Sequence, residues 1–189
     1  MPDMADYGIH ETAAFQPLLP INPAGMPVEE YLRTPYSPDR EYRDGMVLER
    51  NVGDKEHSRL QARLAQYLGR RRKQWNIEVY TELRVQVTPK WYPLPDVCIY
   101  TLPDFEGRYP SEPPLLWIEI LSQDDLMKDV WKKTSDLLQG GVPMVWIIDP
   151  TTLESELRTS DGIRQVIDKT LLVPGSLIEI SLVLESTDM

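Results

Sequence analysis

The chain has 189 residues, of which 41% are hydrophobic and 26% charged, so it can form one globular domain with a core of its own. No apolar run approaches the ~20 residues that cross a bilayer, and the acidic start of the chain does not resemble a secretory signal, so we expect no membrane association. A single cysteine, Cys98, excludes an intramolecular disulfide and fits a reducing compartment, which predicts a cytoplasmic protein.

The net charge of −10 is unevenly distributed along the chain. Residues 31–90 carry 13 basic and 8 acidic side chains, whereas residues 91–189 carry 7 basic and 17 acidic ones. The total charge disfavours a nucleic-acid partner, but a local basic face could still meet phosphate groups, and metal-binding carboxylates would explain part of the excess acid. The basic run 70–73 therefore has two open interpretations, a phosphate-binding patch or a solvated helix end.

The beginning of the chain differs in composition from the rest. Residues 1–26 contain four prolines and no lysine or arginine, which predicts a flexible leader. After this point, apolar periodicity and turn signals alternate without an internal repeat. We therefore predict a single domain over residues 27–185.

Helical and strand patterns alternate along the predicted domain. The clearest helix runs from a capping Asp54 to about Lys73, with apolar side chains at helical spacing. The nearly all-apolar run 115–121 predicts a central strand, and Ser122 would cap a second long helix that ends at Gly140. The other predicted elements are a helix at 27–33, a turn at 41–45, and strands at 46–50, 77–87, 96–100, 144–148, 153–158, 163–167 and 177–183. This order predicts an α/β (α+β) fold with a mixed central β-sheet flanked by helices.

Two acidic residues stand in apolar strands, where valine or isoleucine is usual. Asp96 follows Pro95 and opens the run Asp-Val-Cys-Ile-Tyr, and Glu119 lies in the middle of Trp-Ile-Glu-Ile-Leu. An ionised side chain in such a segment is costly unless it is paired or bound to a metal. A cap at the start of a strand would explain Asp96 taken alone, but Glu119 has no comparable structural explanation, which indicates a functional role.

If the two strands are neighbours, the carboxylates of Asp96 and Glu119 converge near the strand ends. Two carboxylates and a backbone carbonyl, here that of Ile120, suit a hard cation such as Mg²⁺ or Mn²⁺. Such an ion can activate a water molecule and stabilise charge on a phosphate that is being cleaved. Lys133, or its neighbour Lys132, could supply an ammonium group from the following helix. Either lysine taken alone would be an ordinary solvated helix residue.

The order and spacing of these residues resemble a known nuclease motif. Pro95-Asp96 followed by Glu119-Ile-Leu121 is similar to the PD-(D/E)XK motif, with Leu121 where that motif has its lysine. More closely, the chain resembles a bacterial family of restriction-endonuclease-like proteins, most of them without an assigned function. The family's segments occur here, between residue 27 and about residue 168, as Glu41, Asp44-Gly45, His57, Pro95-Asp96-Val97, Glu119-Ile-Leu-Ser122, Asp129 with Lys133, Gly141-Val142, and Trp146-Ile-Ile-Asp149-Pro150.

The resemblance implies a restriction-endonuclease-like core whose lysine has moved from the strand to the next helix, which favours Lys133. It also implies that Glu41 approaches the site as an outer or additional metal carboxylate, and His57 as a phosphate contact or proton carrier. The sequence departs from the family pattern at Gln123, where proline is usual, and at Leu137, where tyrosine is usual. The second departure weakens any expectation of a substrate contact at that position.

The sequence thus supports two hypotheses. The first is a metal-dependent endonuclease that hydrolyses phosphodiester bonds of DNA with Mg²⁺ or Mn²⁺, and that forms a homodimer because cutting a duplex requires two sites. Its candidate site residues are Asp96, Glu119, Ile120, Lys133, Glu41 and His57. The second is a catalytically inactive nuclease-fold module for nucleic-acid binding or protein assembly, which the net charge of −10 favours.

Overall fold

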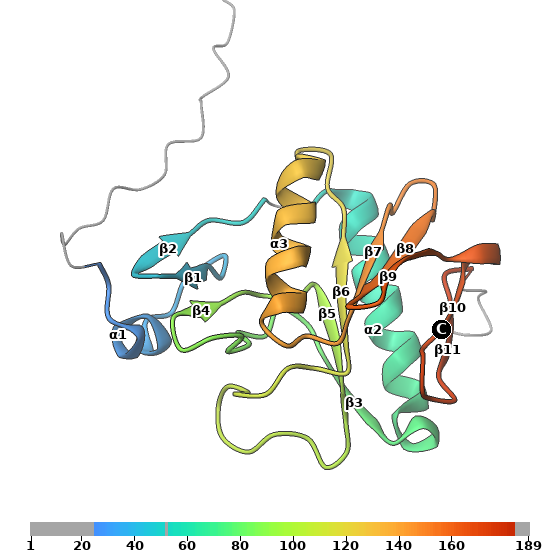
Figure 1. Cartoon of the computed structure of the whole chain (residues 1–189), viewed down its shortest axis with the longest axis horizontal. Coiled ribbons are helices and arrows are strands. Elements are labelled where there is room, and N and C mark those ends of the chain that lie inside the picture. Colours follow the sequence, from blue (N-terminus) through green and yellow to red (C-terminus); the bar gives the residue numbers. More distant parts are fainter. Residues whose placement is uncertain (1–24, 52, 184–189) are drawn as a thin grey trace, which may run out of the picture.

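A computed structural model describes residues 25–51 and 53–183 of the chain. Figure 1 shows a central sheet with a long helix on each side, α2 and α3, and a smaller sheet at each flank. The mixed α/β arrangement expected from the sequence is confirmed. Within the described residues, no helix combines the length and the apolar character needed to cross a membrane.

The central sheet has six strands in the order β3-β5-β6-β7-β8-β9. They are β3 (Ile77–Tyr80), β5 (Val97–Thr101), β6 (Leu116–Ile120), β7 (Met144–Ile148), β8 (Ser155–Thr159) and β9 (Gly162–Gln165). Neighbouring strands are antiparallel except β6 and β7, which are parallel and are joined by helix α3 (Met127–Gln139). A parallel pair needs a crossover of this kind, so α3 follows the carboxyl end of β6 and returns across one face of the sheet.

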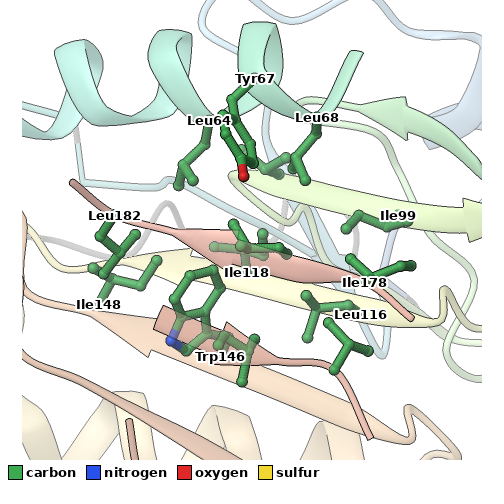
Figure 2. Packing of buried hydrophobic residues seen from close by; sticks show 14 of the residues in the cluster. Leu64, Tyr67, Leu68, Ile99, Leu116, Ile118, Trp146, Ile148, Ile178 and Leu182 are labelled. Carbon is green, nitrogen blue, oxygen red and sulfur yellow. The ribbon is translucent and has the colours of Figure 1, made fainter. Parts of the chain in front are cut away.

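Helix α2 (Lys55–Trp75) covers the opposite face of the central sheet. Asp54 caps it, because its carboxylate accepts a hydrogen bond from the backbone N–H of His57 at 2.9 Å. Figure 2 shows side chains of α2 pointing towards the strands, among them Leu64 and Leu68. The hairpin of β10 (Thr170–Leu172) and β11 (Glu179–Ser181), which follows the short 3-10 helix η1 (Ile167–Lys169), packs against the same core.

The face of the sheet towards α3 has a second core. Trp117, Val145 and Ile147 of β6 and β7 pack there with Leu137 of the helix. Side chains two residues apart on a strand share a face, so Glu119 lies on the same face as Trp117. Strand β6 therefore directs its carboxylate towards the helix that carries the lysines.

A three-stranded sheet, in the order β2-β1-β4, stands beside the central sheet (Figure 1). Its strands are β1 (Glu41–Arg43), β2 (Met46–Leu48) and β4 (Trp91–Tyr92), and the helix α1 (Val28–Arg33) packs against it. Tyr31, Tyr42 and Tyr92 form its buried aromatic core. The small sheet holds Glu41 next to the central sheet, where the backbone N–H of Leu94 donates to its carboxylate at 3.3 Å.

The strand predicted at 77–87 is wrong beyond Tyr80. Glu82 has a φ of 51°, which turns the chain out of the extended conformation. From Glu82 onwards the chain runs beside the segment 93–95. The backbone N–H of Glu82 donates to the carbonyl of Pro95 at 3.0 Å, and that of Val85 donates to the carbonyl of Pro93 at 3.1 Å. A proline has no N–H to return such a bond, so a regular ladder cannot form there.

The prediction that Ser122 caps the second long helix is also wrong. Helix α3 begins at Met127, and the position before it, Leu126, provides no side-chain cap. Ser122 instead donates its backbone N–H to the carboxylate of Asp125 at 2.7 Å, and the N–H of Asp125 donates to the Ser122 carbonyl at 3.2 Å. This local turn delays the helix, because the polar side chain offers the backbone an alternative to helical hydrogen bonding.

Most other predicted elements are confirmed, with shifted ends. The helix after Asp54, the central strand around Glu119 and the buried strand 144–148 correspond to α2, β6 and β7. The first three residues of the predicted turn at 41–45 form β1, and the strands β4 and β10 were missed. The predicted leader falls almost entirely outside the described residues, and the domain limits 27–185 stay a prediction.

Candidate functional site

A cleft with a volume of ≈ 770 Å³ opens at the carboxyl end of β6, lined by residues of β1, β6, α3 and the connection from β2 to α2. All six residues predicted for the site line it. Seven of the lining residues are carboxylates: Glu41, Glu49, Asp96, Glu119, Asp124, Asp125 and Asp129. We call this region the carboxylate cleft. Its basic side chains are Arg50, Lys133 and the imidazole of His57.

Asp96 is 2% exposed and connects three parts of the fold. Its Oδ2 accepts a hydrogen bond from the backbone N–H of Ile120 at 2.7 Å, which ties the start of β5 to the end of β6. Its Oδ1 accepts from Nη2 of Arg50 at 2.7 Å, and His57 Nε2 lies 3.3 Å from Oδ2. A buried carboxylate needs such partners, because an isolated charge would be strongly destabilising.

Glu119 lies beside Asp96 because β5 and β6 are adjacent antiparallel strands. Its Oε1 accepts a hydrogen bond from the indole N–H of Trp117, two residues earlier on the same strand face, at 3.0 Å. The same oxygen lies 2.5 Å from Nζ of Lys133. The expectation that the two misplaced acids share one site therefore agrees with this geometry.

Lys133 reaches the carboxylate cleft from the middle of α3. Its ammonium group contacts Glu119 and also donates to Oε1 of Glu41 at 2.9 Å, so it bridges the central and the small sheet. Lys132 turns instead to the helix surface and pairs with Asp136 at 3.0 Å. The choice of Lys133 over Lys132, made on resemblance, thus matches the direction of the two side chains.

His57 lies in the first turn of α2, where its ring faces Asp96. The hydrogen bond to Asp96 raises the pKa of His57 above its ordinary value, although burial opposes this change. Its Nδ1 is buried without a hydrogen-bond partner among the described residues. Gly53 leaves room for the ring, since a Cβ at that position would lie 2.3 Å from Nδ1.

The two central carboxylates differ in acidity. Burial raises the pKa of Glu119 above its ordinary value, even though the charge of Lys133 lowers it. Burial would also raise the pKa of Asp96, but the hydrogen bond with His57 and the charge of Arg50 together hold it below the ordinary value. Burial opposes the charge of Lys133, yet Glu119 and Glu41 raise its pKa, so the lysine is an ammonium ion at neutral pH.

Sequence reasoning missed the two residues that donate side-chain hydrogen bonds to the central carboxylates besides Lys133 and His57, namely Arg50 to Asp96 and Trp117 to Glu119. The i, i+2 spacing of Trp117 and Glu119 was a usable signal, because it places both on one strand face. Arg50 gave no comparable signal. It was assigned to the end of a strand, whereas in the structure it follows β2 and reaches Asp96, 46 residues away in the chain.

The donor types in the carboxylate cleft fit a hard divalent cation, since Asp96, Glu119 and the carbonyl of Ile120 are all oxygen donors. Among the described residues, however, no three His, Cys, Asp or Glu side chains are grouped as a ready-made metal site. Arg50 and Lys133 hold the carboxylates in their place. A metal would therefore share or replace contacts that these basic side chains make.

The basic run 70–73 lies at the other end of α2 from His57. At 1.5 Å of rise per residue, the 13 residues between His57 and Arg70 span about 20 Å. Within the run, Arg72 pairs with Glu78 at 2.7 Å, and the guanidinium of Arg71 lies over the ring of Tyr67. The run therefore lies outside the carboxylate cleft, and none of its residues lines it.

A mixed sheet with a helix on each face, and a cleft of carboxylates and one lysine at the carboxyl end of a central strand, is the architecture of the restriction-endonuclease-like class. The chain belongs to the Uma2 family, described as "Putative restriction endonuclease", which matches residues 28–187. The recognition made from the short motifs is thus confirmed.

Among the solved structures similar to this chain is a "putative nuclease belonging to DUF820" from Anabaena variabilis ATCC 29413. The two chains are 23% identical and superpose with a TM-score of 0.67, over 82% of this chain and 93% of that chain. At this identity the likeness concerns the fold alone. No curated protein matches the chain.

Proposed function

We propose that this protein is a metal-dependent endonuclease that hydrolyses phosphodiester bonds of DNA at the carboxylate cleft. Family membership supports a nuclease-like function. The observation that carries the finer proposal is the position of Lys133 Nζ, 2.5 Å from Glu119 and 2.9 Å from Glu41. A lysine among carboxylates, in a chain whose strand motif has Leu121 at the usual lysine position, fits a catalytic ammonium group that has moved to the next helix.

In this proposal, Asp96, Glu119 and the carbonyl of Ile120 would hold Mg²⁺ or Mn²⁺. A bound ion would lower the pKa of a water molecule and offset the charge of the phosphate under attack. Lys133 would orient the attacking oxygen or stabilise the negative charge that develops on the phosphate. Asp96 is already oriented for this role, because the backbone of Ile120 fixes one of its oxygens.

The remaining two residues would act around this centre. Glu41 would serve as an outer carboxylate that holds the ammonium group of Lys133 in position. His57 would contact a phosphate or carry a proton, since its ring lines the cleft and its Nε2 lies 3.3 Å from Asp96 Oδ2. The cut is expected in DNA, and a homodimer would supply the second site needed for both strands of a duplex.

Nicking of supercoiled plasmid with Mg²⁺ or Mn²⁺ tests this proposal, with Lys133→Ala and its neighbour Lys132→Ala as a matched pair. We expect Lys133→Ala and Glu119→Ala to slow nicking by about 100-fold or more, because each removes a charge from the reacting centre. Lys132→Ala removes a surface pair with Asp136 and should stay within about twofold of the unaltered protein. Equal activity of all four proteins, or none in any, would contradict catalysis at this site.

One observation favours the second candidate function, an inactive nuclease-fold module for binding or assembly. The carboxylates that would hold a metal are already paired with Arg50 and Lys133. Isothermal titration with Mn²⁺ separates the two candidates. An active site should bind the ion and lose binding in Asp96→Ala, whereas a module that works without metal should show no heat of binding in either protein.

The homodimer is tested by light scattering after size-exclusion chromatography. Trp131, 48% exposed on α3, is a large apolar side chain that a second subunit could cover. A monomeric mass with exclusively nicked plasmid products would argue against a dimer, whereas linear product from a dimer would support it.

A further inference from the structure

Arg50 occupies the oxygen of Asp96 that a metal ion would need. Oδ2 of Asp96 is held by the N–H of Ile120 at 2.7 Å, and this amide belongs to the backbone of a central strand. The other oxygen, Oδ1, accepts its hydrogen bond from Nη2 of Arg50, also at 2.7 Å. The Arg50 side chain can move away without disturbing a strand, whereas the Ile120 amide cannot.

Arg50 also balances the charge of the whole cluster. Its Nε lies 3.9 Å from Oε1 of Glu41, and its charge acts on Glu119 as well. Three carboxylates, two permanent cations and one imidazole form a group that is close to neutral. The four further carboxylates of the cleft would attract a divalent ion, but at Asp96 itself the charge of Arg50 opposes the ion, so tight binding there requires that Arg50 moves away.

The two permanent cations differ in what they hold. Lys133 pairs with Glu119 and Glu41, while Arg50 pairs with Asp96. The side chain of Arg50 is 19% exposed and lines the open cleft, so it has space in which to reorient. An arginine with a purely structural role would be expected to remain bound to Asp96 whether or not an ion is present.

We propose that Arg50 is an exchangeable counter-ion: it holds Asp96 in the metal-free protein and competes with a divalent cation for Oδ1 of that residue. This inference rests on the proposed function, because it assumes that Asp96 is a metal ligand. It goes further by assigning a role to a residue outside the recognised motif. Its consequence is that the protein folds without metal, and that the strength of metal binding is set by an arginine that is not a ligand.

The test is isothermal titration of Mn²⁺ into three full-length proteins: unaltered, Arg50→Gln and Arg40→Gln. Arg40 makes a suitable control, because it pairs with Glu49, another carboxylate of the cleft, at 2.8 Å, and its replacement changes the net charge equally. We expect Arg50→Gln to bind Mn²⁺ at least about tenfold more tightly, which corresponds to about 1.4 kcal/mol. Arg40→Gln should stay within about twofold of the unaltered protein.

Thermal unfolding supplies a second measurement that does not depend on activity. Without metal, Arg50→Gln should melt at a lower temperature than the unaltered protein, because Asp96 loses its counter-ion. Saturating Mn²⁺ should stabilise Arg50→Gln more than it stabilises the unaltered protein. A variant that is unfolded alone but folds with Mn²⁺ would support the proposal equally, whereas one that stays unfolded with Mn²⁺ would overturn it.

The outcomes separate this inference from the proposed function. Equal or weaker Mn²⁺ binding by Arg50→Gln, while the unaltered protein binds the ion, would overturn the role of Arg50 and leave the metal site intact. No binding by either protein would overturn both. Tighter binding by Arg40→Gln to the same degree would also refute the inference, because the effect would then be a general consequence of charge.

Discussion

Gly53 determines where the ring of His57 can lie. The glycine precedes the N-cap residue of α2, and the imidazole packs directly over its Cα, with 2.3 Å between a hypothetical Cβ and Nδ1. Any larger residue would push the ring, whose Nε2 lies 3.3 Å from Asp96. The orientation of one candidate site residue thus depends on a neighbour that has no side chain.

We expect Gly53→Ala to displace His57 from Asp96 and to lower the pKa of His57 towards 6.5, its value outside a folded protein. An NMR titration of the histidine rings measures this change, and His57→Gln identifies the signal, because the chain has two histidines. Gly69→Ala is the control, since a Cβ there meets nothing within 4 Å. An unchanged pKa in Gly53→Ala would show that the ring adapts without losing Asp96.

Helix α3 and strand β1 are joined by one ion pair that lies outside the carboxylate cleft. Arg43 of β1 and Asp136 of α3 lie 2.7 Å apart, and the guanidinium of Arg43 also stacks over the ring of Trp91 at 4.5 Å. These two elements carry Glu41 and Lys133, which meet in the cleft. The pair therefore helps to hold the two halves of the candidate site at a constant separation.

Asp136→Asn should lower the free energy of unfolding by about 0.5–1 kcal/mol at pH 7, because the pair is partly exposed. Partial burial would raise the pKa of Asp136, but hydrogen bonds from Arg43 and Lys132 hold it below 3.8. This contribution is complete above the unfolded pKa and is lost as the pH falls through the folded pKa. Urea unfolding between pH 7 and pH 3 should show the two proteins converging in acid.

A double-mutant cycle with Arg43→Gln checks that the effect belongs to the pair. The coupling energy should be clearly above the error of about 0.3 kcal/mol at pH 7 and should vanish in acid. Strictly additive effects at pH 7 would indicate that Asp136 stabilises α3 by another route, such as its pair with Lys132.

The whole molecule combines a net charge of −10 with a cleft of seven carboxylates and few cations. Phosphate groups of DNA would be repelled from such a surface, because like charges oppose association over about 10 Å at ordinary salt concentrations. A divalent ion in the cleft would offset part of this repulsion. DNA binding is therefore expected to depend on the metal more strongly than in a nuclease with a basic surface.

Fluorescence anisotropy with a short labelled duplex should show at least about tenfold tighter binding in Ca²⁺ than in EDTA, because a divalent ion in the cleft would offset part of its negative charge. Glu119→Gln, measured in EDTA, should bind DNA slightly better than the unaltered protein, since it removes one negative charge. Equal affinity in Ca²⁺ and EDTA would place the DNA-binding surface away from the carboxylate cleft.

The sequence by itself determined the class of fold, the central strand with its anomalous Glu119, the capped helix after Asp54 and the family. These features depend on local periodicity, caps and short motifs, which a linear reading contains. The tertiary structure alone decided that Arg50 pairs with Asp96 and that the basic run lies far from the cleft. It also decided that strand β3 ends at Tyr80, before the chain runs beside the prolines of the segment 93–95. Each of these results from contacts between residues distant in the chain, which depend on how the elements pack and which no local pattern encodes.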